Sequence, residues 1–390
     1  MNSCYPQFPC LTPLARITGN GDESILSNPA NGRWIRINNK VLFCLRAQNL
    51  QSITLNLLKL ADSEEVEALL SVLKEYDFID FDGGKIYPEN FSLSPHSAYL
   101  NVTNNCNLRC KHCYYDSSPG LSQGVSNLKL FSIIDSFKRA GIANMVIAGG
   151  EPLTRKGITE VFEYIRDKDF QEVTLLTNGT IYADHIVASV ARCVSQIHVS
   201  LDGPDDASNA VLRGKGNFES ALIGISKFKA AGIDKVKLIT SITSQNIKRL
   251  PEMRRLSDSL GVEIGTTIFT PVGRGKKHLA LRPSNQDLIR SFLEEFSLLN
   301  CDNSIADDAS LDINAGVTCG AGTLMVSIDC FGNVFPCHLF HKPQYKFGNL
   351  LKQPDLLEMI RSSKAAHQFR DRNVEKRKCH GCTVEYFCKG

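Results

Sequence analysis

The sequence has no long hydrophobic run, and its first 20 residues contain no continuous apolar stretch. A membrane-spanning helix needs about 18 or more consecutive apolar residues, and a secretory signal needs a shorter apolar core near its start. The sequence contains neither pattern, so it supports neither membrane insertion nor secretion. We therefore expect a cytoplasmic protein with no membrane partner.

An excess of one charge is also missing, because 44 Lys and Arg residues are balanced by 41 Asp and Glu residues. Such a balance gives no reason to expect nucleic acid as a partner. The short basic run Lys276, Lys277 and His278 is best interpreted as a solvated face. The 390 residues, 43% of them hydrophobic, are enough for two or three packed units, each with its own core.

Cysteine, in contrast, is abundant, since the chain has 14. Disulfide frameworks are typical of small secreted domains, and this sequence is long and carries no secretion signal. The cysteines are also clustered, with three at 106–113 and three more at 379–388. Both features favour metal ligation over disulfides or scattered core thiols.

Residues 1–92 are predicted to form a small winged-helix-like domain. Two apolar segments, 34–37 and 41–45, resemble strands on either side of a turn. Asp62, with Glu65 three residues later, is predicted to cap a helix. The apolar face of this helix is formed by Val66, Leu69, Leu70 and Leu73.

Residues 96–300 alternate short apolar runs with amphipathic stretches, which predicts an α/β fold with strand–helix units around a parallel sheet. In such sheets the functional groups lie beyond the carboxyl ends of the strands. After residue 300 the periodicity stops, and a Cys-rich extension at 301–390 lacks a large core of its own, so metal ligation would replace one. The predicted strands are 99–102, 145–148, 173–177, 196–201, 236–242 and 262–269.

Three cysteines, Cys106, Cys110 and Cys113, lie in one loop directly after the first predicted strand. Three thiolates this close together can bind three irons of a [4Fe-4S] cluster and leave the fourth iron open to a small ligand. Zinc is the alternative, and His112 could supply a fourth ligand. However, His112 is adjacent to Cys113, which is awkward for joint ligation of one ion.

A second motif, Gly149-Gly150-Glu151-Pro152, follows the second predicted strand. Its glycines can expose backbone groups to a small ligand, and Glu151 can accept a hydrogen bond from a charged amino group. Alone, a Gly-Gly pair at a strand end most often marks a tight turn. Together with the cysteine loop, the motif resembles the radical S-adenosylmethionine (SAM) superfamily.

This resemblance implies a partial (β/α)6 TIM-like barrel whose open iron binds the methionine amino and carboxylate groups of SAM. It also implies that His112 lies near the adenine and that Ser200 and Asp202 contact the ribose. Arg213 and Arg274 also fit the family pattern, although each could equally be a turn or surface residue. The implied cofactor-binding residues are His112, Gly149, Gly150, Glu151, Pro152, Asn178, Ser200, Asp202 and Arg213.

The tail resembles the SPASM extension, which carries auxiliary iron–sulfur clusters in related maturases. The implied ligands are Cys319, Cys337, Cys379, Cys382 and Cys388, for one or two auxiliary clusters. The family pattern continues with a cysteine three residues beyond Cys388, whereas this sequence stops at Gly390, so we expect either a truncated sequence or an incomplete set. A structural zinc at the last three cysteines, with His380 or His338, is the alternative.

A winged-helix-like module, a radical barrel and a SPASM tail together resemble enzymes that modify ribosomally made precursor peptides. The N-terminal domain would bind the leader by strand addition, or would simply cover the barrel. Hydrogen abstraction would then lead to a carbon–carbon or thioether cross-link, with a flavodoxin- or ferredoxin-type electron donor. The alternatives are peptide epimerisation, decarboxylation, a sulfatase-maturing activity, and a non-enzymatic metal- and peptide-binding regulator.

Overall fold

The computed structural model describes residues 10–12, 15–20, 23–28, 33–47, 49–80, 95–288, 290–291, 314–317 and 320–370. The chain forms two compact units, and each is described by itself. The first consists of Met1–Leu93, Asp302–Gly320 and Asp371–Gly390, and the second of Ser94–Cys301 and Ala321–Arg370. The division into domains at 1–92, 96–300 and 301–390 stays a prediction.

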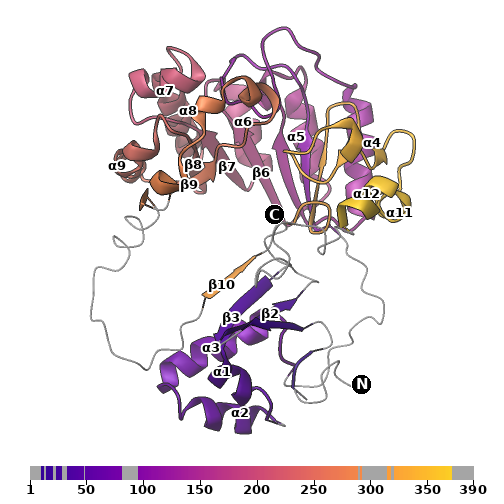
Figure 1. Ribbon diagram of the computed structural model, residues 1–390. Coiled ribbons are helices and arrows are strands. Elements are labelled where there is room, and N and C mark those ends of the chain that lie inside the picture. The colour runs from indigo at the N-terminus through magenta and orange to yellow at the C-terminus, as the bar shows by residue number, and fades with distance from the viewer. Residues whose placement is uncertain are drawn as a thin grey trace. The chain divides into compact units, whose positions relative to one another are not determined.

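In its described residues, the first unit has a four-stranded antiparallel sheet and three helices, and both are drawn in Figure 1. Its first three strands follow one another along the chain, whereas its fourth comes from far down the sequence and pairs with the third. The strands are β1 (Arg16–Asn20), β2 (Glu23–Asn28), β3 (Arg33–Asn38) and β10 (Asn314–Val317). The helices are α1 (Asn39–Cys44), α2 (Leu50–Leu57) and α3 (Ser63–Glu75).

The predicted capped helix is confirmed as α3. The Asp62 side chain accepts a hydrogen bond from the Glu65 amide at 2.9 Å, and the apolar face buries Val66, Leu69 and Leu73. Strand β3 also confirms the prediction for residues 34–37. These residues pack in one core with apolar residues of β2, α1 and α2.

The strand predicted at 41–45 is wrong, because these residues lie mostly in helix α1. The Asn38 side chain accepts a hydrogen bond from the Val41 amide at 2.9 Å, so this asparagine caps a helix and does not form a hairpin turn. Val41 and Cys44 are three residues apart and both are buried, which is the helical spacing. A segment of five apolar residues is compatible with the periodicity of a helix or of a strand, and here the Asn38 cap favours the helix.

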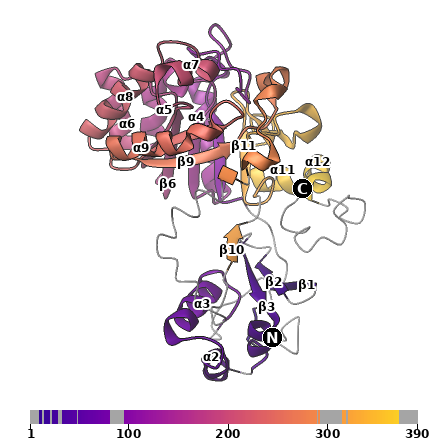
Figure 2. The same ribbon diagram turned by 60° about the vertical axis from the view of Figure 1, so that its left-hand side comes forward.

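The second unit contains a sheet in which the six strands predicted for residues 96–300 lie side by side and are parallel. Each of these six predicted strands is confirmed within two residues at each end. Figure 2 shows helices α4, α5, α6 and α8 grouped on one side of this sheet. The six strands are β4 (Ser97–Asn101), β5 (Asn144–Ala148), β6 (Glu172–Thr177), β7 (Gln196–Ser200), β8 (Val236–Ile242) and β9 (Glu263–Ile268). The helices are α4 (Asn127–Arg139), α5 (Ile158–Arg166), α6 (Asp184–Cys193), α7 (Asp206–Arg213), α8 (Phe218–Ala230) and α9 (Leu250–Leu260).

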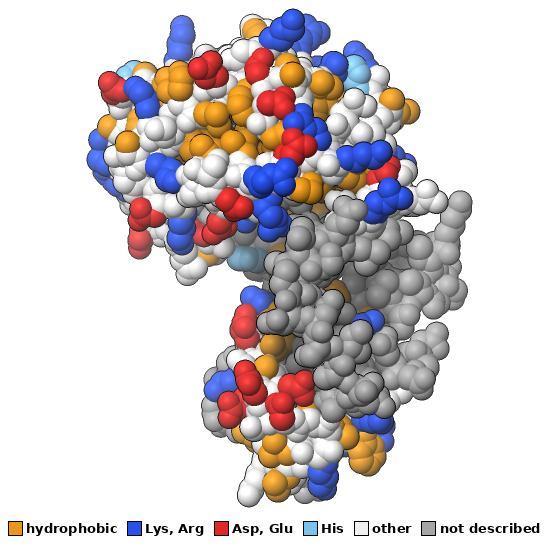
Figure 3. Space-filling model, turned by 90° about the vertical axis from the view of Figure 1, so that its left-hand side faces the viewer, with side chains coloured by type: hydrophobic (Ala, Val, Ile, Leu, Met, Phe, Trp, Pro, Cys, Tyr) orange, Lys and Arg blue, Asp and Glu red, His pale blue; other side chains and the backbone are white. Residues whose placement is uncertain are grey.

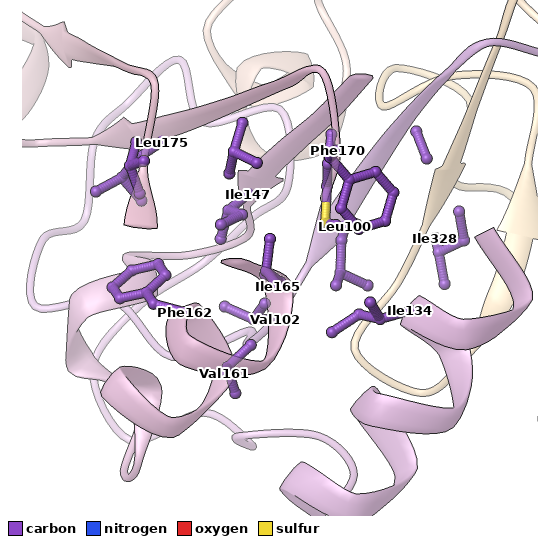
Figure 4. Packing of buried hydrophobic residues seen from close by; sticks show 14 of the residues in the cluster. Leu100, Val102, Ile134, Ile147, Val161, Phe162, Ile165, Phe170, Leu175 and Ile328 are labelled. Carbon is purple, nitrogen blue, oxygen red and sulfur yellow. The ribbon is translucent and has the colours of Figure 1, made fainter. Parts of the chain in front are cut away.

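The described part of the tail extends this sheet beyond β4. Strand β11 (Met325–Ile328) pairs in parallel with β4, and β12 (Asn333–Phe335) and β13 (Gly348–Asn349) continue the sheet in antiparallel fashion. Helices α11 (Leu356–Ser362) and α12 (Lys364–Arg370) follow. The tail therefore shares the core of the barrel, and Figure 4 shows Ile328 of β11 beside Leu100 and Ile134.

The surface of the second unit carries both signs of charge. On the face shown in Figure 3, Lys and Arg side chains alternate with Asp and Glu around a group of hydrophobic side chains. This mixture agrees with the near balance of charge in the sequence. Within the described ranges, no helix has both the length and the apolar character that a membrane span requires.

Candidate active site

The three clustered cysteines lie in the loop that follows β4, at the carboxyl end of the sheet. The side chain of Cys106 is buried and those of Cys110 and Cys113 are partly buried, whereas Arg109 and Lys111 between them are exposed. The amides of Leu108 and Ser117 donate hydrogen bonds at 3.4 Å to the sulfurs of Cys106 and Cys113. The loop therefore turns its thiols inward and its cations to solvent.

The Gly-Gly-Glu motif holds the start of this loop. The amide of Gly150 donates to the Thr103 carbonyl at 2.8 Å, and the amide of Glu151 donates to the Asn105 carbonyl at 2.9 Å. A Cβ atom at Gly150 would lie 2.1 Å from the Asn105 carbonyl oxygen, and one at Gly149 would lie 2.4 Å from that of Thr103. Only glycine fits at either position, because the two backbones pack directly against each other.

Glu151 is fully buried and links the ends of β5 and β6. Its carboxylate accepts hydrogen bonds from the Asn178 amide at 2.7 Å, the Thr177 hydroxyl at 2.8 Å and the Leu153 amide at 3.1 Å. Burial raises its pKa to about 7, against the effect of these hydrogen bonds. A carboxylate offers about four acceptor positions, so one remains for a ligand. Pro152 begins a buried 3-10 turn beside it.

Asn178 connects the carboxyl end of β6 to the cysteine loop. Its side-chain amide donates to the Asn107 side chain at 2.9 Å, and the Asn107 amide donates to the Thr180 hydroxyl at 2.8 Å. The motif after β6 is thus tied to the residue that directly follows Cys106. This contact places Asn178 beside the cysteine loop, and its role in cofactor binding stays a prediction.

His112, Asp202 and Arg213, predicted separately from three motifs, form one buried cluster. The Asp202 carboxylate lies 2.6 Å from Arg213 Nε and 3.2 Å from His112 Nε2, and it also accepts from the Ser241 amide at 2.8 Å. Burial lowers the pKa of His112 to about 4, although Asp202 acts in the opposite direction. His112 Nδ1 is buried and has no hydrogen-bond partner among the described residues.

This cluster bears on the predicted ribose contacts. Asp202 has no exposed surface, and both of its oxygens already face partners of this chain. Ser200, the last residue of β7, is only partly buried and lies two residues before Asp202. Ser200 is therefore the more accessible of the two, and the ribose contact of each stays a prediction.

Arg274, which the sequence left undecided, clamps the cysteine loop. Its guanidinium is buried, donates to the carbonyls of Cys110 at 2.8 Å and Ser117 at 2.5 Å, and pairs with Asp116 at 3.0 Å. Its own amide donates to the Cys113 carbonyl at 2.9 Å. The preceding Gly273 has a φ of 54° and packs against the Tyr114 carbonyl, a fit that only glycine allows.

The three thiols fit the ligand set of an iron–sulfur cluster. They belong to one loop, Cys110 and Cys113 both contribute to raising the pKa of Cys106, and none of the three is in a disulfide. Burial raises the pKa of Cys106 to about 12, so iron would have to replace its proton. No three Cys, His, Asp or Glu side chains in the described ranges form a group around a single metal ion. In a [4Fe-4S] cluster, each thiolate instead binds an iron of its own.

Of the predicted auxiliary ligands, only Cys337 lies in the described residues, where it is buried. Cys319, Cys379, Cys382 and Cys388 lie outside them. The residue after Cys337, His338, contacts the ring of Tyr114, the residue after Cys113, at 5.2 Å between centroids. No local sequence pattern predicts this contact, which joins two cysteine segments more than 200 residues apart.

Comparison with protein families and known proteins agrees with this geometry. Residues 100–257 match the model of the Radical SAM superfamily, and residues 319–383 match the model of SPASM, an iron–sulfur cluster-binding domain. The mycofactocin maturase MftC of Mycolicibacterium smegmatis is 26% identical over 281 residues, which cover 69% of this chain and 71% of MftC. The subtilosin biosynthesis protein AlbA of Bacillus subtilis is 27% identical over 288 residues, covering 70% and 61%.

The fold is similar to that of SuiB of Streptococcus suis. The crystal structure of SuiB bound to S-adenosylmethionine has a TM-score of 0.64 and 16% identity, covering 98% of this chain and 95% of SuiB. The structure bound to its precursor peptide SuiA has a TM-score of 0.63 and 17% identity.

The predicted fold class and cofactors are confirmed: an α/β barrel that uses a [4Fe-4S] cluster with SAM, and auxiliary iron–sulfur clusters in the tail. The chain therefore belongs to the radical SAM superfamily and carries a SPASM domain in its C-terminal part.

Proposed function

We propose that this radical SAM enzyme is a maturase that modifies a ribosomally made precursor peptide. The observation that carries the proposal is the similarity of fold to SuiB, which extends over 98% of the chain and therefore includes the N-terminal unit. SuiB has been solved with its precursor peptide, and MftC is named a maturase. A precursor peptide is accordingly the proposed partner, and the cytoplasm is the proposed location.

In this proposal Cys106, Cys110 and Cys113 hold the cluster. When bound, the cluster and SAM would supply a 5′-deoxyadenosyl radical able to remove a hydrogen atom from the substrate. Glu151 would accept a hydrogen bond from the methionine ammonium of SAM at its remaining acceptor position, and Arg213 is a buried cation whose charge acts on Glu151. The proposed SAM-contacting residues are His112, Gly149, Gly150, Glu151, Pro152, Asn178, Ser200, Asp202 and Arg213.

We infer that the product is an intramolecular cross-link, either carbon–carbon or thioether. Forming such a bond removes two hydrogens: one leaves as an atom to the radical, and the other leaves as a proton with an electron. An auxiliary cluster held in part by Cys319 and Cys337 would accept that electron. Peptide epimerisation and decarboxylation begin with the same abstraction and are distinguished by the mass of the product.

The test is co-expression of the enzyme with the short peptide encoded beside its gene, under low oxygen. We expect the peptide to lose the mass of two hydrogens, and fragmentation to locate the new bond. A Cys113→Ala enzyme should leave the peptide unchanged, since one iron loses its ligand. Gain of one deuterium in heavy water without loss of mass would indicate epimerisation, and an untouched peptide would favour a folded protein as substrate.

A flavodoxin- or ferredoxin-type protein is the proposed electron donor, and the charges around the cysteine loop support it. Segments 104–115, 210–218 and 270–282 contain six exposed Lys or Arg residues and no Asp or Glu. The second segment touches the first through the Lys111 amide and the Leu212 carbonyl, 2.8 Å apart. The third touches it through Arg274, as described above. Exposed cations on both sides of the loop would attract an acidic donor.

Charge reversal tests this docking. We expect Lys111→Glu and Lys276→Glu each to lower cofactor cleavage driven by reduced flavodoxin by about tenfold, because long-range attraction is lost. Cleavage driven by dithionite, which needs no docking, should change less than about twofold. Lys235→Glu is the matched control, because Lys235 is exposed at the opposite, amino-terminal end of the strands. An equal loss with both reductants would contradict docking and indicate a damaged cofactor site.

A further inference from the structure

The edge strand β10 of the N-terminal sheet comes from a part of the chain far from the other three strands. Strands β1, β2 and β3 form a continuous antiparallel arrangement, and β10 adds to the free edge of β3 from about 280 residues away (Figures 1 and 2). The edge of β3 can therefore bind a distant segment of chain as an added strand, through backbone hydrogen bonds.

The pairing of β10 is the weakest in this sheet. It joins four residue pairs, whereas β2 and β3 share six and β1 and β2 share five. Its sequence is Asn314-Ala315-Gly316-Val317, and only the valine favours strands. A short edge strand of such residues contributes little beyond its backbone hydrogen bonds, so another extended segment can replace it at small cost.

Strand β3 also offers side chains that a replacing strand could contact. Ile35 and Ile37 point into the core of the unit, and Trp34 and Arg36 alternate with them on the partly buried face. Arg33 lies at the start of the strand and pairs with Glu75 at 3.0 Å. An extended peptide with aromatic or β-branched residues and some acidic ones would make better cross-strand pairs with this face than β10 can.

We propose that β10 is an exchangeable strand, and that an extended segment of the precursor peptide displaces it from the edge of β3. The inference rests on the proposed function, because it names the surface on which the precursor binds. Since β10 occupies that surface in the free enzyme, the apparent dissociation constant of the peptide equals the intrinsic constant divided by the fraction of molecules in which β10 is detached.

The chain contains a reporter for this exchange. Trp34 is its single tryptophan, and in the β3–β10 ladder it lies opposite Gly316. We would titrate the full enzyme with a synthetic peptide matching the short gene encoded beside it, with a scrambled peptide as control, and follow Trp34 emission. The native peptide is expected to change the emission, and the scrambled peptide is not.

Two variants move the affinity in opposite directions. Ala315→Pro with Gly316→Pro removes backbone donors from β10, and we expect the dissociation constant of the peptide to fall at least about threefold. Asn314→Thr, Ala315→Val and Gly316→Val together strengthen β10, and we expect that constant to rise at least about threefold. Equal constants in both variants and the natural enzyme would overturn the proposal, and so would weaker binding by a folded proline variant.

The second variant keeps the test decisive if the proline variant fails to fold, because an unchanged constant in the strengthened strand alone would overturn the exchange. Peptide modification and peptide binding together distinguish a failure of the strand exchange from a failure of the proposed function. If the natural enzyme modifies the peptide while the β10 variants bind it equally, only the exchange is wrong. If the natural enzyme leaves the peptide unmodified and Trp34 emission unchanged, the precursor itself is wrong.

Discussion

Replacing Cys110 by alanine is expected to lower the formation of 5′-deoxyadenosine by at least about a thousandfold, a loss of roughly 4 kcal/mol in transition-state stabilisation. The cluster would keep only two of its three thiolates in the loop. The measurement is the amount of 5′-deoxyadenosine formed from SAM under reducing, oxygen-free conditions, together with the iron and sulfide content of the purified protein.

The matched control is Cys193→Ala. Cys193 is also a buried thiol, but it lies at the end of α6 and packs in the apolar core of the barrel unit. Its loss should cost some stability and leave cofactor cleavage within about twofold of the natural enzyme. Cleavage that persists in Cys110→Ala at the natural rate would rule out the assignment of this loop as the cluster site.

Replacing Arg274 by glutamine is expected to lower the free energy of unfolding by about 3 kcal/mol, since two buried hydrogen bonds from a charged donor are lost. We expect the cysteine loop to lose its clamp as well, because Arg274 holds the carbonyls of Cys110 and Ser117. The electron paramagnetic resonance spectrum of the reduced cluster should broaden, and SAM should bind at least about tenfold more weakly.

Two controls separate the clamp from a general loss of stability. Arg274→Lys keeps the charge but not the forked donors, so we expect it to restore part of the stability and little of the SAM affinity. Arg282→Gln removes an exposed arginine eight residues further along and should change neither quantity. A natural spectrum and natural SAM affinity in Arg274→Gln would show that the loop does not depend on the clamp.

The sequence predicted the barrel well because its strands are apolar runs separated by long amphipathic helices. Strand β8, for example, has the predicted bounds of 236–242. It did not predict β11, β12 and β13, which have four, three and two residues. Such short strands have no periodicity to detect, and pairing with β4 and with one another stabilises them instead.

The candidate site was predicted residue by residue but not as an arrangement. Motif positions identified His112, Asp202 and Arg213 as three separate cofactor contacts. The structure brings them together, and the Asp202 carboxylate pairs with both His112 and Arg213. Which side chains pair depends on how loops after different strands meet, and local sequence carries no signal for that. The same holds for Arg274, whose partners lie more than 150 residues away.

The pairing of β11 with β4 limits how this enzyme can be recombined with its relatives. Strand β4 carries the cysteine loop, and its Asn101 side chain donates to Ser327 and to the Ile328 carbonyl on β11. A chimera joined at residue 300 would therefore divide a continuous sheet directly beside the cluster site. The two parent enzymes would have to carry compatible residues along β4 and β11, so the tail cannot be exchanged by itself. We expect substitutions in β11 to be accompanied by substitutions in β4 among relatives.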